Sequence, residues 1–162
     1  MAQNSILFAE NDGICFIKLI GSIQYTISSG FDKLVAQILA SKTIKEAIFD
    51  VTQATHIDST NLGLMARIAN SLIEKYDHKP VIICDNTDIN TLFLSMGFEH
   101  AFLIVKKLEM VQPELFELPA EKQKRADQLK MLTNAHRTLM EMNDKNHDTF
   151  KTVVEMFENE DI

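Results

Sequence analysis

The sequence is poor in the residues that mark secreted, disulfide-rich or membrane-spanning proteins. Among 162 residues it has two cysteines, three prolines, five glycines and no tryptophan. Cys15 and Cys84 lie in separate apolar runs, which is typical of core residues and not of a disulfide or redox pair. No apolar run approaches the roughly 20 residues that a membrane span needs. Residues 1–5 lack the charged-then-apolar order of a secretory signal. We therefore expect a cytoplasmic protein without membrane contact.

The chain also lacks an excess of basic residues and the common motifs of catalysis. Its formal net charge is −7, whereas a nucleic-acid-binding protein needs a basic face to neutralise phosphate. The five histidines are scattered, and none belongs to a metal-ligand cluster, a phosphate-binding glycine loop or a nucleophile elbow. His56 lies two residues from Asp58, a weak hint of a catalytic pair. These absences predict a protein that is not an enzyme and uses no cofactor, metal or nucleic acid.

The hydrophobic pattern alternates between strand-like and helix-like segments. Asn11-Asp12-Gly13 separates the first two apolar runs, and Asp-Gly between such runs indicates a hairpin. Gly97 directly follows a helical segment, as a left-handed C-cap does. We expect strands at 6–10, 14–20, 47–51, 81–84 and 102–105, and helices at 31–39, 62–76 and 89–96. A strand–helix alternation after a hairpin predicts an α/β fold with a mixed, mostly parallel sheet covered by helices.

Residues 106–162 have a different composition, and we place a domain at 1–110 and a helical extension at 111–162. The extension has no glycine, and its apolar residues recur at three- and four-residue steps, which indicates helices. Polar residues interrupt this pattern at His136, Asn143 and Asn146, and we expect two helices with a joint near Asn143. The apolar stripe has three interpretations: packing against the domain, pairing with a second copy, or docking of a partner, for which its four methionines are suited.

The segment between the strand at 47–51 and the helix at 62–76 is rich in Asp, Ser, Thr and Asn. This composition is typical of a helix N-cap, with Asp58 or Ser59 as the capping residue. A helix N-terminus also accommodates a phosphate, because it offers unpaired N–H groups and a partial positive charge. An exposed Ser59 is therefore a candidate phosphorylation site. Its phosphate would repel a docking partner by charge and desolvation, beside the existing carboxylate of Asp58.

The hexapeptide Asp58-Ser59-Thr60-Asn61-Leu62-Gly63 resembles the signature of STAS domains of the anti-sigma factor antagonist type. In that family the pattern runs Asp-Ser-Ser/Thr-Gly-Leu-Gly after a buried strand. The resemblance extends over residues 5–110 and includes Gly21 and the pair Gly97-Phe98. It implies a STAS-like α/β fold, with the 111–162 extension as an addition to it.

The resemblance further implies a phosphorylation-controlled protein-binding switch in a bacterial partner-switching pathway that regulates sigma-factor-dependent transcription. Ser59 matches the phosphoacceptor, and Asp58 and Thr60 match its neighbours. The partners implied are an anti-sigma factor, a serine kinase and a PPM-type phosphatase. Asn61 replaces the usual glycine, and we expect it to tolerate unusual backbone angles. Gln24 stands where many antagonists have an acidic residue. The predicted partner-binding residues are Asp58, Ser59, Thr60, Asn61 and Gln24.

Two other functions fit the same sequence. One is a STAS adaptor subunit of a transport assembly, such as one for lipid trafficking. The other is a subunit of a large stress-sensing scaffold, in which the C-terminal helices would form a homodimer or a larger oligomer. An intact phosphoacceptor motif favours the switch over the adaptor.

Overall fold

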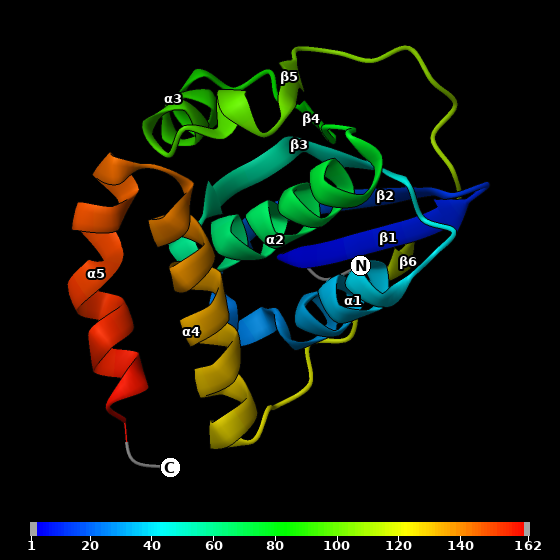
Figure 1. Cartoon of the computed structure of the whole chain (residues 1–162). Coiled ribbons are helices and arrows are strands. Elements are labelled where there is room, and N and C mark those ends of the chain that lie inside the picture. The colour runs from blue at the N-terminus through cyan, green and yellow to red at the C-terminus, as the bar shows by residue number, and fades with distance from the viewer. Residues whose placement is uncertain (1–2, 161–162) are drawn as a thin grey trace.

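The computed structural model describes residues 3–160, in which a sheet is flanked by helices and followed by a helical hairpin (Figure 1). Two short 3-10 turns, Tyr25–Ile27 and Phe98–His100, join longer elements. In chain order the strands and helices are β1 (Ser5–Asn11), β2 (Ile14–Ile23), α1 (Ser29–Ala40), β3 (Glu46–Ile57), α2 (Ser59–Tyr76), β4 (Val81–Ile83), α3 (Thr87–Ser95), β5 (Leu103–Val105), β6 (Phe116–Glu117), α4 (Arg125–Met142) and α5 (Asp144–Glu158).

The six strands of the described residues form one sheet in the order β5-β4-β3-β2-β1-β6. β2, β3, β4 and β5 pair in parallel, whereas β1 pairs antiparallel with β2 and β6. The predicted mixed, mostly parallel α/β fold is confirmed. The β1–β2 turn contains Asp12 and Gly13 with φ of 52° and 83°, as expected for a tight hairpin turn. Gly97 after α3 has φ of 79°, the left-handed conformation predicted for it.

The core lies between the sheet and the helices that cover it. Ile17, Leu19 and Phe49 of the central strands are fully buried, together with Phe31 and Val35 of α1. Eleven of the 18 residues of α2 are buried, because the sheet lies on one side of the helix and α4 on the other. Both cysteines are buried and free, in agreement with the prediction that they are core residues. Burial raises the pKa of Cys15 to about 12, so its thiol stays protonated.

The C-terminal region contributes more to the domain than the sequence predicted. β6, which comes from residues assigned to the extension, pairs with β1 and adds a sixth strand to the sheet. The two predicted helices are present, and Asn143 separates α4 from α5. α4 lies between α2 and α5 at one end of the sheet (Figure 1). Of the three interpretations of the apolar stripe, the structure shows packing against the domain. The boundary at residue 110 remains a prediction.

Candidate functional site

The candidate site forms where the loops after β2 and β3 meet. These strands are parallel neighbours, and Ile23 pairs with Ile57 at their carboxyl ends. The backbone N–H of Asp58 donates to the carbonyl of Ile23 at 3.0 Å, which joins the two loops directly. Gln24, an exposed residue, is therefore held close to the start of α2. The topology thus explains why two segments that are 33 residues apart in sequence, Tyr25 and Asp58, contribute to one surface.

Asp58 is the N-cap of α2 and connects three parts of this site. Its Oδ1 accepts hydrogen bonds from the backbone N–H of Asn61 at 3.0 Å and from the Asn61 side-chain amide at 2.8 Å. Its Oδ2 accepts from the backbone N–H of Tyr25 at 2.7 Å. Both carboxylate oxygens are therefore occupied, so Asp58 fixes the β2 loop against the first turn of α2.

Asn61 has a different role from the one predicted. It lies in the regular first turn of α2 and has no unusual backbone angle, so the expected tolerance of such angles is not used. Its side chain is completely buried, donates to Asp58 and accepts from the hydroxyl of Ser28 at 2.7 Å. Thr60 is also buried, at 3 % exposure. Of the five predicted partner-binding residues, Gln24 is exposed, Asp58 and Ser59 are half-buried, and the other two side chains face inward.

Ser59 is the first residue of α2, and its hydroxyl is not free in solvent as the sequence suggested. Its Oγ lies 2.7 Å from Nε2 of His136, a residue of α4 that is 5 % exposed. Nδ1 of His136 lies 2.7 Å from the carbonyl oxygen of Leu132, which can only accept, so Nδ1 carries a proton. In the neutral ring Nε2 is then the acceptor, and Ser59 donates to it.

The surroundings of His136 favour this neutral form. The rings of Phe150 and Phe157, both from α5, have their centroids 5.7 and 5.5 Å from the imidazole. Burial lowers the pKa of His136 below its ordinary value of 6.5; the Leu132 carbonyl and the Asp58 carboxylate act in the opposite direction, more weakly. A hydroxyl on an imidazole nitrogen is also the geometry of a nucleophile and its base. Neither residue, however, lines the polar cleft of about 500 Å³ that lies between α1, α2 and α4.

Nothing in the sequence pattern placed His136 at the site. Its only signal was its position as a polar interruption in the apolar stripe of the extension. Asn143 and Asn146 are the two other interruptions, and both donate side-chain hydrogen bonds to the carbonyl oxygen of Met96 at the end of α3, at 3.2 and 2.9 Å. All three polar interruptions are therefore points where the C-terminal hairpin, α4 and α5, attaches to the rest of the domain.

Between these attachments α4 approaches α2 very closely. A Cβ atom on Gly63 would lie 2.3 Å from the carbonyl oxygen of Ala135, well inside contact distance. One face of α4 is buried on this side. Its buried residues are spaced by four positions: Met131, Ala135 and Leu139. The last glycine of the hexapeptide thus gives α4 the space to lie against the start of α2.

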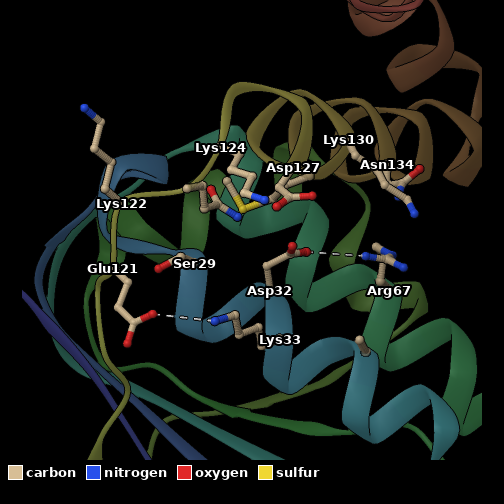
Figure 2. Close-up of a pocket in the computed structure, with 13 residues that line it drawn as sticks. Ser29, Asp32, Lys33, Arg67, Glu121, Lys122, Lys124, Asp127, Lys130 and Asn134 are labelled. Atoms are coloured by element: carbon tan, nitrogen blue, oxygen red, sulfur yellow. Dashed lines mark ion pairs between the residues drawn. The ribbon is translucent and has the colours of Figure 1, made fainter. Parts of the chain in front are cut away.

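A polar cleft of about 500 Å³ borders this interface, between α1, α2 and the segment that leads into α4 (Figure 2). Asp32 pairs with Arg67 at 3.8 Å, and Lys33 pairs with Glu121 at 3.7 Å. Burial raises the pKa of Asp32, and Arg67 partly offsets that effect. The interface of α4 with the domain therefore has an apolar centre and a charged rim on this side.

Within residues 3–160 no group of three or more acidic, histidine or cysteine residues is arranged to hold a metal ion. None of the helices in that range is both long and apolar enough to cross a bilayer.

The fold is a mixed, mostly parallel sheet, with a capped helix and Ser59 after the carboxyl end of β3. Comparison with family models identifies its class. The STAS domain model matches residues 5–110, and the chain belongs to the STAS domain family. No curated protein sequence matches the chain significantly.

Solved structures of two anti-sigma factor antagonists share the fold. The first, SpoIIAA in its unphosphorylated form, has a TM-score of 0.52 at 12 % sequence identity, over 63 % of this chain and 87 % of that one. The second, an anti-sigma factor antagonist from Mycobacterium paratuberculosis, has a TM-score of 0.54 at 13 % identity, over 64 % of this chain and 86 % of that one. At such low identity these similarities establish a common fold.

Proposed function

We propose that the protein is an anti-sigma factor antagonist, a non-catalytic switch whose binding surface lies at the start of α2 and is controlled by phosphorylation of Ser59. The observation that carries the proposal is the position of Ser59 at the first residue of α2 in a STAS domain, directly after the Asp58 cap. Solved antagonists with the same fold support it. The partners are an anti-sigma factor, which it binds when unphosphorylated, a serine kinase and a PPM-type phosphatase.

The chemistry of the site suits this role. The first-turn N–H groups of a helix have no partners within the helix and create a partial positive charge, so the start of α2 can accommodate a phosphate. The same phosphate would add about 1.5 to 2 negative charges beside Asp58. A partner that contacts Gln24 and the start of α2 would then meet repulsion and a desolvation cost, without any change in the sheet.

Affinity capture from the native lysate tests the proposal, with the wild-type chain, Ser59→Ala and Ser59→Asp as baits. We expect one partner that Ser59→Ala retains and Ser59→Asp loses or exchanges. Thr87→Asp is the matched control, because Thr87 is the exposed first residue of α3 after an Asn86 cap. Identical partners for all baits would contradict the switch, and membrane-transport subunits bound by every bait would support the adaptor function instead. The intact mass of the protein from cells shows independently whether it is phosphorylated.

A further inference from the structure

The contact between Ser59 and His136 places the proposed phosphorylation site under the C-terminal hairpin. The two side chains are in direct hydrogen-bond contact at 2.7 Å. The imidazole also lies beside the rings of Phe150 and Phe157 of α5, so it contacts both helices of the hairpin and α2. A kinase or partner that reads the Ser59 hydroxyl must therefore first displace His136, and with it α4.

A phosphate on Ser59 is incompatible with this contact. The phosphorus would be bonded to the same oxygen that the imidazole contacts, so the phosphoryl group and His136 would compete for one space. The loss of the hydroxyl proton also removes the donor of the hydrogen bond. The neutral imidazole offers the dianion no charge, and the Asp58 carboxylate next to it repels the dianion.

The interface between α2 and α4 leaves little room for a partial adjustment. Gly63 faces the backbone of Ala135 so closely that not even a methyl group fits between the two helices. Packed helices of this kind shift between discrete arrangements and do not deform continuously. The polar attachments of the hairpin to α3, from Asn143 and Asn146 to Met96 and from Lys145 to Ser95, are hydrogen bonds that water can replace. Met131, Leu139 and Phe150 also pack into the core, so release of the hairpin exposes these apolar side chains.

We propose that the C-terminal hairpin is a tethered competitor, which occupies the partner-binding surface through the Ser59–His136 and Gly63–Ala135 contacts and is expelled when Ser59 is phosphorylated. The proposal rests on the proposed function, from which it takes phosphorylation as the modification of Ser59. In the closed form α4 covers the start of α2. An anti-sigma factor that binds the unphosphorylated chain must displace α4 from that surface. In the open form the phosphate excludes this partner from the start of α2, and the apolar face of α4 around Met131 and Leu139 becomes available to other partners.

Hydrogen exchange of the full-length chain, with phosphoserine incorporated at position 59, tests the release directly. We expect the amides of α4 and α5 to exchange at least about tenfold faster than in the unmodified chain, because exchange reports local opening. Amides of β2 and β3 should be unchanged. Phosphoserine at position 87 is the control, since it adds the same charge to the first turn of α3. Unchanged or slower exchange in α4 with phosphoserine 59 would overturn the proposal, the slower case meaning that His136 holds the phosphate.

Two uncharged substitutions test the contacts without phosphate. Gly63→Ala should release α4, because the new methyl group would overlap the Ala135 backbone, and it should raise exchange in α4 and α5 at least about tenfold. His136→Ala should raise it less, and His147→Ala, in an exposed part of α5, should leave it unchanged. If the amides of α4 stay protected from exchange in Gly63→Ala, the hairpin is a fixed part of the domain and the proposal is wrong. These exchange measurements need no partner, so their failure is distinguishable from a failure of the capture experiment.

Discussion

The N-termini of α2 and α3 have the same local design and different surroundings. Each has an Asx N-cap whose side chain accepts from the third residue of the helix, Asp58 from Asn61 at 3.0 Å and Asn86 from Ile89 at 3.1 Å. In each, a hydroxyl residue follows the cap. Thr87 is exposed, whereas Ser59 is half-buried and bonded to His136. The comparison teaches that capping chemistry alone does not mark a switch, because only the contacts from other elements distinguish these two sites.

The first way to sharpen this comparison is to remove each cap. We expect Asp58→Ala to lower the free energy of unfolding by about 2–4 kcal/mol, because it removes a cap and leaves the Tyr25 N–H and the buried Asn61 amide without a partner. Asn86→Ala should cost about 1 kcal/mol, the ordinary value of a cap. Urea denaturation of both variants measures the difference. Equal losses would show that Asp58 does no more than cap its helix.

A second, smaller effect concerns the buried amide of Asn61. Asn61→Gly restores the residue that antagonists of this family usually have, yet we expect it to cost about 2–3 kcal/mol here. The substitution removes the hydrogen bonds to Ser28 and Asp58 and adds the entropic cost of glycine in a helix. Asn70→Gly, at an exposed position of the same helix, is the control and should cost under about 1 kcal/mol. Chemical denaturation is the measurement, and a neutral Asn61→Gly would contradict the role given to the amide.

The smallest effect is the pH dependence of hairpin docking. We expect it at the start of α2, where His136 contacts Ser59, and not at the start of α3. The pKa of His136 is lowered in the closed form and returns to about 6.5 when the ring is exposed. Docking is therefore strongest above pH 6.5 and weakens as the pH falls from 6.5 towards the lowered value, because the open form then binds an extra proton. Asp58 is the carboxylate that faces the ring, and it partly offsets this loss.

Hydrogen exchange of α4 at pH 7.5 and 5.5, corrected for the intrinsic rate, measures this dependence. His136→Ala, which has no imidazole to titrate, should abolish it. A docking equilibrium that strengthens on acidification would contradict the neutral form of His136.

The order of strands and helices along the chain, up to β5, was predictable because each of these elements has a local signal. The Asp12-Gly13 turn and the glycine after α3 bounded elements, short apolar runs indicated strands, and apolar residues at three- and four-residue steps indicated helices. The hexapeptide also located the segment that carries Ser59, which is the start of α2. The short β6 was missed, because two exposed residues at a sheet edge carry no such signal.

The burial of the site was not predictable in the same way. The pattern of the extension showed three polar interruptions but could not show what each would face, since a buried polar residue is explained only by its tertiary partner. The pattern therefore identified His136 only as a polar interruption of an apolar stripe. It predicted that Thr60 and Asn61 would be surface residues of a polar loop. The burial of His136 is explained by its contact with Ser59 across the α2–α4 interface, and that of Asn61 by its contact with Ser28; both are long-range contacts without a local signature.

The most direct test is the pKa of the His136 side chain, measured by NMR titration in the full-length chain with and without phosphoserine at position 59. The closed form predicts a pKa below 6.5 in the unmodified chain and a return to about 6.5 after phosphorylation, as α4 leaves the site. A pKa that stays low would show that the hairpin remains docked over the phosphate. A pKa that rises well above 6.5 would show an imidazolium bound to the phosphate. Either result would contradict release of the hairpin by phosphorylation.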